Sequence, residues 1–87
     1  MTAAERRASQ ALLAAAEEDP ELLIPARDYM KRLVNEISQS SQKPTEALTL
    51  LLAREGIRFL DILEINPMSS KQTREVVEQL SQRAQEV

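Results

Sequence analysis

The residues that interrupt helices divide this chain into four stretches, each long enough to form one helix. They are few for 87 residues: one glycine and four prolines, at Pro20, Pro25, Pro44, Gly56 and Pro67. Between them, apolar residues recur at intervals of three and four, the period of an amphipathic helix, and no stretch alternates with period two for long. The sequence therefore predicts an all-α fold, a small four-helix bundle-like domain occupying residues 1–87.

Capping residues indicate where the helices begin. Thr2 and Glu5 have the spacing of a capping box, in which each side chain satisfies a backbone amide of the other residue. Asp19 stands before a proline, as an N-cap often does, and Ser69 or Ser70 is placed to cap the last helix. The four expected helices are residues 3–18, 20/25–39, 44–65 and 70–85.

Two of these helices contain a residue that could interrupt them. Pro25 either leaves residues 20–24 as a single turn before a helix that starts at Pro25, or kinks one longer helix. Gly56 either breaks residues 44–65 into two shorter helices or lies inside one helix, where glycine is less favourable than alanine. We expect one continuous helix through Gly56.

The third stretch is apolar around most of its circumference, which is typical of a helix that meets more than one partner. One stripe on it is Leu50, Ala53, Ile57 and Leu60, and a second is Leu48, Leu52, Phe59 and Leu63. A third set, Leu51, Ile62 and Ile65, shares its face with Glu55 and Arg58. Because three short helices cannot readily cover so much apolar surface, we expect a homodimer whose interface is formed by Leu51, Arg58, Ile62 and Ile65.

The side chains on which enzymes most rely are missing. The chain has no His and no Cys, which removes the commonest general base, the best nucleophile and the usual ligands of transition metals. The acidic run at residues 17–21 lacks the loop spacing and the glycine of a calcium site, and a single glycine excludes a phosphate-cradling loop. We therefore expect that the protein is not an enzyme, with no catalytic residues, no metal and no cofactor.

The charge pattern does not support binding to nucleic acid or to a membrane. The net charge is −3, and residues 1–43 and 44–87 carry −1 and −2, so neither part is basic. The polar faces mix both signs, whereas a membrane-surface helix needs a basic one, and no apolar run could span a bilayer. We expect a soluble, cytoplasmic protein that has neither nucleic acid nor membrane as a partner.

One segment carries a resemblance. Residues 59–77, FLDILEINPMSSKQTREVV, combine the end of an apolar helix, a turn containing proline, and a helix start with serine caps. The segment resembles the opening of a winged helix-turn-helix, which implies a small DNA-binding transcriptional regulator. It departs from that pattern because a turn and a recognition helix should follow, whereas residues 70–87 continue without glycine.

These observations favour a non-catalytic protein–protein interaction module that acts through apolar helix faces. Its partner is another protein, which the sequence does not identify, in addition to a second copy of the chain. Regulators, antitoxins, chaperones and assembly factors all fit this description. The alternative is the DNA-binding regulator, with a helix-turn-helix-like C-terminal half.

Overall fold

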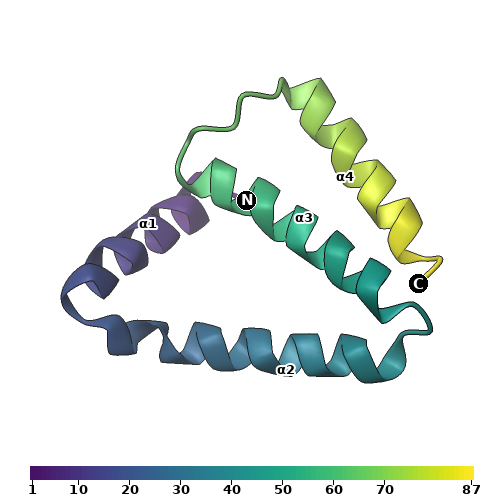
Figure 1. The fold of residues 1–87 in the computed structure, drawn as a ribbon. Coiled ribbons are helices and arrows are strands. Elements are labelled where there is room, and N and C mark those ends of the chain that lie inside the picture. Colours follow the sequence, from purple (N-terminus) through teal and green to yellow (C-terminus); the bar gives the residue numbers. More distant parts are fainter.

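The computed structural model covers residues 1–87 and contains four α-helices and one short 3-10 helix (Figure 1). Their bounds are α1 (Ala3–Glu18), η1 (Pro20–Leu23), α2 (Ile24–Ser40), α3 (Pro44–Ile62) and α4 (Ser70–Ala84). No strand is formed. The predicted all-α class with four helices is confirmed.

The chain turns between α1 and α2 through the short helix η1. The Oδ1 of Asp19 caps this helix by accepting a hydrogen bond from the N–H of Glu21 at 3.2 Å. Pro20 and Pro25 each lie in the first turn of their helix, where a missing N–H leaves no helical hydrogen bond unmade. The chain therefore adopts the first of the two alternatives at Pro25, a separate turn followed by a helix.

α3 ends at Ile62, three residues earlier than expected, because the backbone then turns left-handed. Glu64 has a φ of 58° and is the only residue other than glycine with a positive φ. Its N–H donates to the carbonyl of Asp61 at 3.2 Å, and the N–H of Ile65 donates to the carbonyl of Leu60 at 3.0 Å. These two bonds form a Schellman motif, in which a glutamate occupies the position that usually belongs to glycine.

Asn66 holds the connection between α3 and α4. Its side-chain amide donates to the Oδ1 of Asp61 at 3.0 Å and to the Oγ1 of Thr73 at 3.2 Å. Its side-chain oxygen accepts from the N–H of Met68 at 2.9 Å. Because Asp61 belongs to α3 and Thr73 to α4, a single side chain ties the end of one helix to the start of the next.

α3 is the centre of the arrangement. α1, α2 and α4 each pack against α3, and none of these three packs against another, while η1 contacts both α1 and α2. Figure 1 shows α3 lying between α2 and α4, with α1 near its C-terminal end. At the other end of α4, the hydroxyl of Ser41 donates to the carbonyl oxygen of Val87. The helices therefore pack against α3 from several sides without closing into a ring around a shared core.

The molecule is flat and exposes an unusually large surface. It measures 40 × 33 × 17 Å, and its radius of gyration of 14.7 Å exceeds the value of about 12 Å expected for a compact chain of 87 residues. The accessible surface is 6894 Å², whereas a folded monomer of 9.8 kDa exposes about 5,200 Å². One chain alone thus leaves about 1,700 Å² more surface in water than a monomer of its mass does.

Candidate interaction surface

The four residues predicted to form a dimer interface do not lie on one surface. Leu51 and Ile62 are the only two buried residues of the chain, with exposed fractions of 8% and 9%. Ile65 is 59% exposed, and Arg58 is exposed as well. Leu51 and Ile62 therefore form the small core of the single chain, and only Ile65 and Arg58 are accessible to a partner in this conformation.

A different face of α3 is uncovered. Leu52, Phe59 and Leu63 are 67%, 52% and 43% exposed, and their spacing of seven and four residues puts them on the same side of the helix. Two more exposed residues lie on this side, Thr49 before Leu52 and Gly56 after it, and they complete a spacing of three and four. We call this set the α3 outer face: Thr49, Leu52, Gly56, Phe59 and Leu63. It contains no charged side chain.

Gly56 lies in the middle of this face, and α3 continues through it without a break, as expected. A methyl group placed on its Cα would meet no atom within 4 Å, and its φ is not positive. Neither the packing of the single chain nor its backbone therefore requires glycine here. Glycine nevertheless lowers the stability of a helix by about 1 kcal/mol relative to alanine. No contact within the single chain offsets this loss of stability.

The sequence contained the signal for this face. Leu52, Phe59 and Leu63 belong to the second of the three apolar stripes of the third stretch. Spacing along a helix groups residues by side but does not say which side a neighbouring helix covers. We expected the third stripe to be uncovered, whereas the helices that pack on α3 bury Leu51 and Ile62 from it. Of the second stripe, Leu48 is half-buried and Leu52, Phe59 and Leu63 stay exposed.

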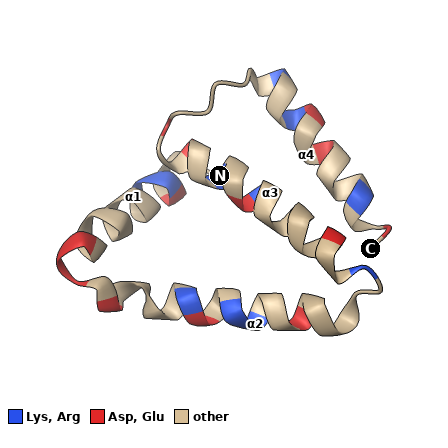
Figure 2. Cartoon of the chain, viewed as in Figure 1, with Lys and Arg blue, Asp and Glu red and all other residues tan.

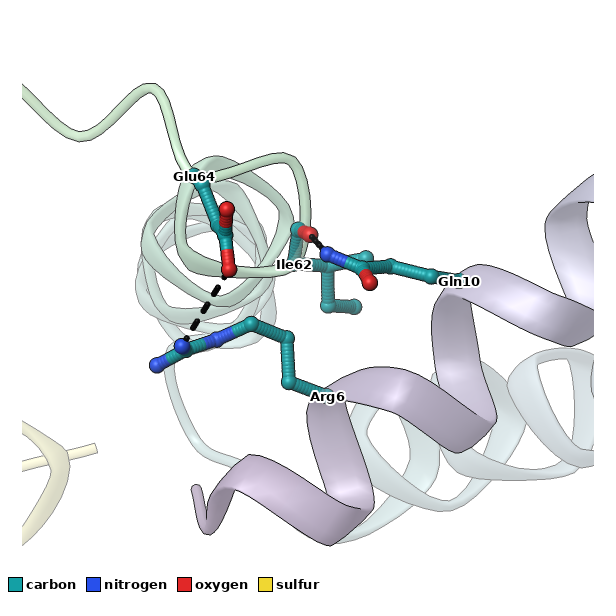
Figure 3. Close-up of polar contacts among 4 residues, drawn as sticks. All are labelled: Arg6, Gln10, Ile62 and Glu64. Atoms are coloured by element: carbon teal, nitrogen blue, oxygen red, sulfur yellow. Dashed lines mark hydrogen bonds and ion pairs between the residues drawn. The ribbon is translucent and has the colours of Figure 1, made fainter.

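Polar side chains gather at a second place, the junction between α1 and the end of α3 (Figure 3). The Nε2 of Gln10 donates to the carbonyl oxygen of Ile62 at 2.7 Å, and Arg6 lies 3.4 Å from the carboxylate of Glu64. The carbonyl of Ile62 lies at the helix end, where such oxygens lack partners within the helix. The contacts are those of a structural junction that fastens α1 to α3.

Charged side chains form no patch of one sign. Figure 2 shows both signs on each of the four α-helices. No three acidic side chains are close enough to hold a metal ion. An open depression runs along the single helix α2 and is lined by Ile24, Pro25, Asp28, Lys31 and Arg32. The uncovered apolar face of α3 is therefore the most distinctive surface of the molecule.

Comparison with known families identifies the chain. A family model described as the tetracyclin repressor-like C-terminal domain matches residues 1–85. The chain belongs to this family. No curated protein and no solved structure matches it. Tetracyclin repressor-like C-terminal domains are helical bundle domains of transcriptional regulators, and they are regulatory rather than enzymatic.

Membership of the tetracyclin repressor-like family corrects one expectation. We expected nucleic acid not to be a partner, and this is wrong, because the family is one of DNA-binding regulators. The expectation rested on the even distribution of charge over these 87 residues. Charge reports only on phosphate contacts made by the surface that carries it. The charge of a C-terminal domain therefore does not show whether the regulator binds DNA.

The segment that resembles a helix-turn-helix has a different geometry in this tetracyclin repressor-like domain. The helices of that motif are joined by a turn of three or four residues and cross at a wide angle. Here residues 63–69 separate α3 from α4, and α4 packs back along α3 (Figure 1). Residues 59–77 thus form a helical hairpin.

None of the helices is both long enough and apolar enough to cross a membrane.

Proposed function

We propose that this chain is the self-associating part of a transcriptional regulator and works by binding protein, in the first place a second copy of itself. The observation that carries the proposal is the excess of about 1,700 Å² of accessible surface over a monomer of equal mass. A standard protein–protein interface removes about 800 Å² from each partner. The excess is therefore large enough to supply one interface.

The thin core supports the same proposal. At 87 residues the chain is only slightly longer than the limit of about 70–80 residues below which a single core rarely stabilises a fold. Only Leu51 and Ile62 are buried in it. Association with a second chain would supply the missing burial. Ile65 and Arg58, which are accessible, remain candidates for contact with a partner.

Family membership supports the regulator among the four classes that the sequence left open, and gives no support to an antitoxin, a chaperone or an assembly factor. Domains of this family serve ligand binding or dimerisation. We favour dimerisation because the depression along α2 is open and lies on one helix, whereas small-molecule sites are concave and enclose most of their ligand. We place the protein in the cytoplasm, which is typical of tetracyclin repressor-like regulators.

Sedimentation equilibrium tests the proposal. Over a range of about 1 to 100 μM, typical of the weaker specific complexes, the chain should sediment as a species of twice 9.8 kDa at the upper end. A single species of 9.8 kDa across the whole range would contradict self-association. Far-ultraviolet circular dichroism on the same samples establishes that the helices are formed, so that an unfolded chain is not mistaken for a monomer.

A further inference from the structure

We propose that the α3 outer face is the surface on which the second copy sits, and that the two α3 helices cross at Gly56. The proposal rests on the proposed function, since it assigns a place to the self-association argued above. It concerns the five residues that define the face: Thr49, Leu52, Gly56, Phe59 and Leu63.

The first argument is that the large apolar side chains that α3 and its C-cap leave exposed, Leu52, Phe59 and Leu63, all lie on this face. α1, α2 and α4 all pack on α3, and the half-buried or buried apolar residues of the helix lie outside this face. Leu52 at 67% and Phe59 at 52% are among the most exposed large apolar side chains in the protein. The spacing of three and four along the face is the spacing by which one helix packs along another.

The second argument is that the face is complementary to itself. In a two-fold dimer the same patch is present on both subunits, so a patch of one charge would repel its copy. The α3 outer face has no charged side chain. Its one hydroxyl group, on Thr49, already donates to the carbonyl of Thr45 at 2.8 Å. Two copies can therefore meet without leaving a charge or a hydroxyl unpaired.

The third argument is the glycine. Gly56 weakens the helix and nothing in the single chain requires it. Small residues allow two helix backbones to approach closely where they cross, as they do in other helix pairs. A crossing at Gly56, with Leu52 on one side and Phe59 on the other, would explain why a glycine lies in the middle of the exposed face of α3.

Substitution of the two aromatic residues of the chain tests the face. Phe59→Lys places a charge in the centre of the proposed interface and should weaken dimerisation by about a hundredfold. Tyr29→Lys is the matched control, because Tyr29 is exposed to a similar extent, 57%, but belongs to α2. The dissociation constant of its dimer, measured by sedimentation equilibrium, should equal that of the wild type. A Phe59→Lys variant that remains folded and dimerises as tightly as the wild type would overturn the proposal.

If Phe59→Lys loses its helical circular dichroism and so does not fold, Gly56→Ala tests the proposal in its place. Alanine favours the helix, so this variant folds at least as readily as the wild type. A methyl group at a close crossing should weaken the dimer by about tenfold, whereas at a free surface it leaves the dimer unchanged. An unchanged or tighter Gly56→Ala dimer overturns the crossing while self-association stands. A monomeric wild type contradicts both proposals.

Discussion

Glu64 holds a backbone conformation that side chains other than glycine rarely adopt. Its φ of 58° lets the chain leave α3 at once and brings the carboxylate to 3.4 Å from Arg6 of α1. A left-handed conformation costs about 1–2 kcal/mol for a residue with a Cβ. The ion pair returns less than about 1 kcal/mol, because the side chains of Glu64 and Arg6 are 63% and 34% exposed. The conformation is therefore sustained mainly by the Schellman bonds and by the packing of α3.

Glu64→Gly should raise the free energy of unfolding by about 0.5–1 kcal/mol, because glycine removes the strain and the lost ion pair is weak. Glu64→Gln is the matched control: it keeps the strained backbone and removes only the charge, so it should lower the free energy of unfolding by a few tenths of a kcal/mol. Urea unfolding at a single protein concentration measures both. A Gly variant less stable than the wild type would show that the contact with Arg6 outweighs the strain.

Adjacent residues show which information the sequence lacks at this scale. Leu51 and Leu52 are the same residue type in the same helix, yet their exposed fractions are 8% and 67%. Local propensity and apolar character are identical for both, so only the positions of α1, α2 and α4 distinguish them. The sequence pattern therefore predicts an interface role for Leu51 and Ile62, whereas the structure places both in the core of the chain.

At the scale of elements, the sequence was more informative because helix ends are set by nearby residues. The hydroxyl of Thr2 accepts from the N–H of Glu5 at 3.1 Å, which is one of the two bonds of the expected capping box; the reciprocal bond from the N–H of Thr2 to Glu5 is not formed. Of the two serines proposed to cap α4, Ser69 does so: its Oγ accepts from the N–H of Gln72 at 3.1 Å, and the side chain of Gln72 accepts from the N–H of Ser69 at 2.9 Å. The end of α3 was misplaced because Glu64 offers no glycine to mark it.

Ser69→Ala should lower the free energy of unfolding by about 1 kcal/mol, because the N–H of Gln72 at the start of α4 loses the hydroxyl that caps it. Ser70→Ala is the matched control, since Ser70 is the first residue of the helix and its hydroxyl makes no bond of this kind. Its stability should stay within about 0.5 kcal/mol of the wild type. Equal losses in the two variants, measured by urea unfolding, would contradict the assignment of the cap.

At the scale of the whole molecule, the arrangement of the helices could not be predicted from the sequence. The expected bundle-like domain has its helices around α3, with no contact of α1, α2 or α4 to one another. The apolar stripes of all four helices are consistent with several arrangements, because aliphatic side chains pack with little directional preference. The structure was needed to show the excess of exposed surface, since it shows that only two residues are buried in the single chain.

If association supplies the burial that the single chain lacks, thermal stability should depend on protein concentration. Folding is then coupled to dimerisation, and a higher concentration shifts the equilibrium toward the folded dimer. For two chains of 87 residues that unfold together, Tm should rise by about 4 °C for each tenfold increase in concentration. Circular dichroism melts at about 2, 20 and 200 μM, chosen to span two decades of that dependence, measure it. Tyr29→Lys should keep the dependence and Phe59→Lys should lose it. A Tm that is the same at all three concentrations would show that α1–α4 fold without a partner, and that the open surface of the single chain needs no second copy for stability.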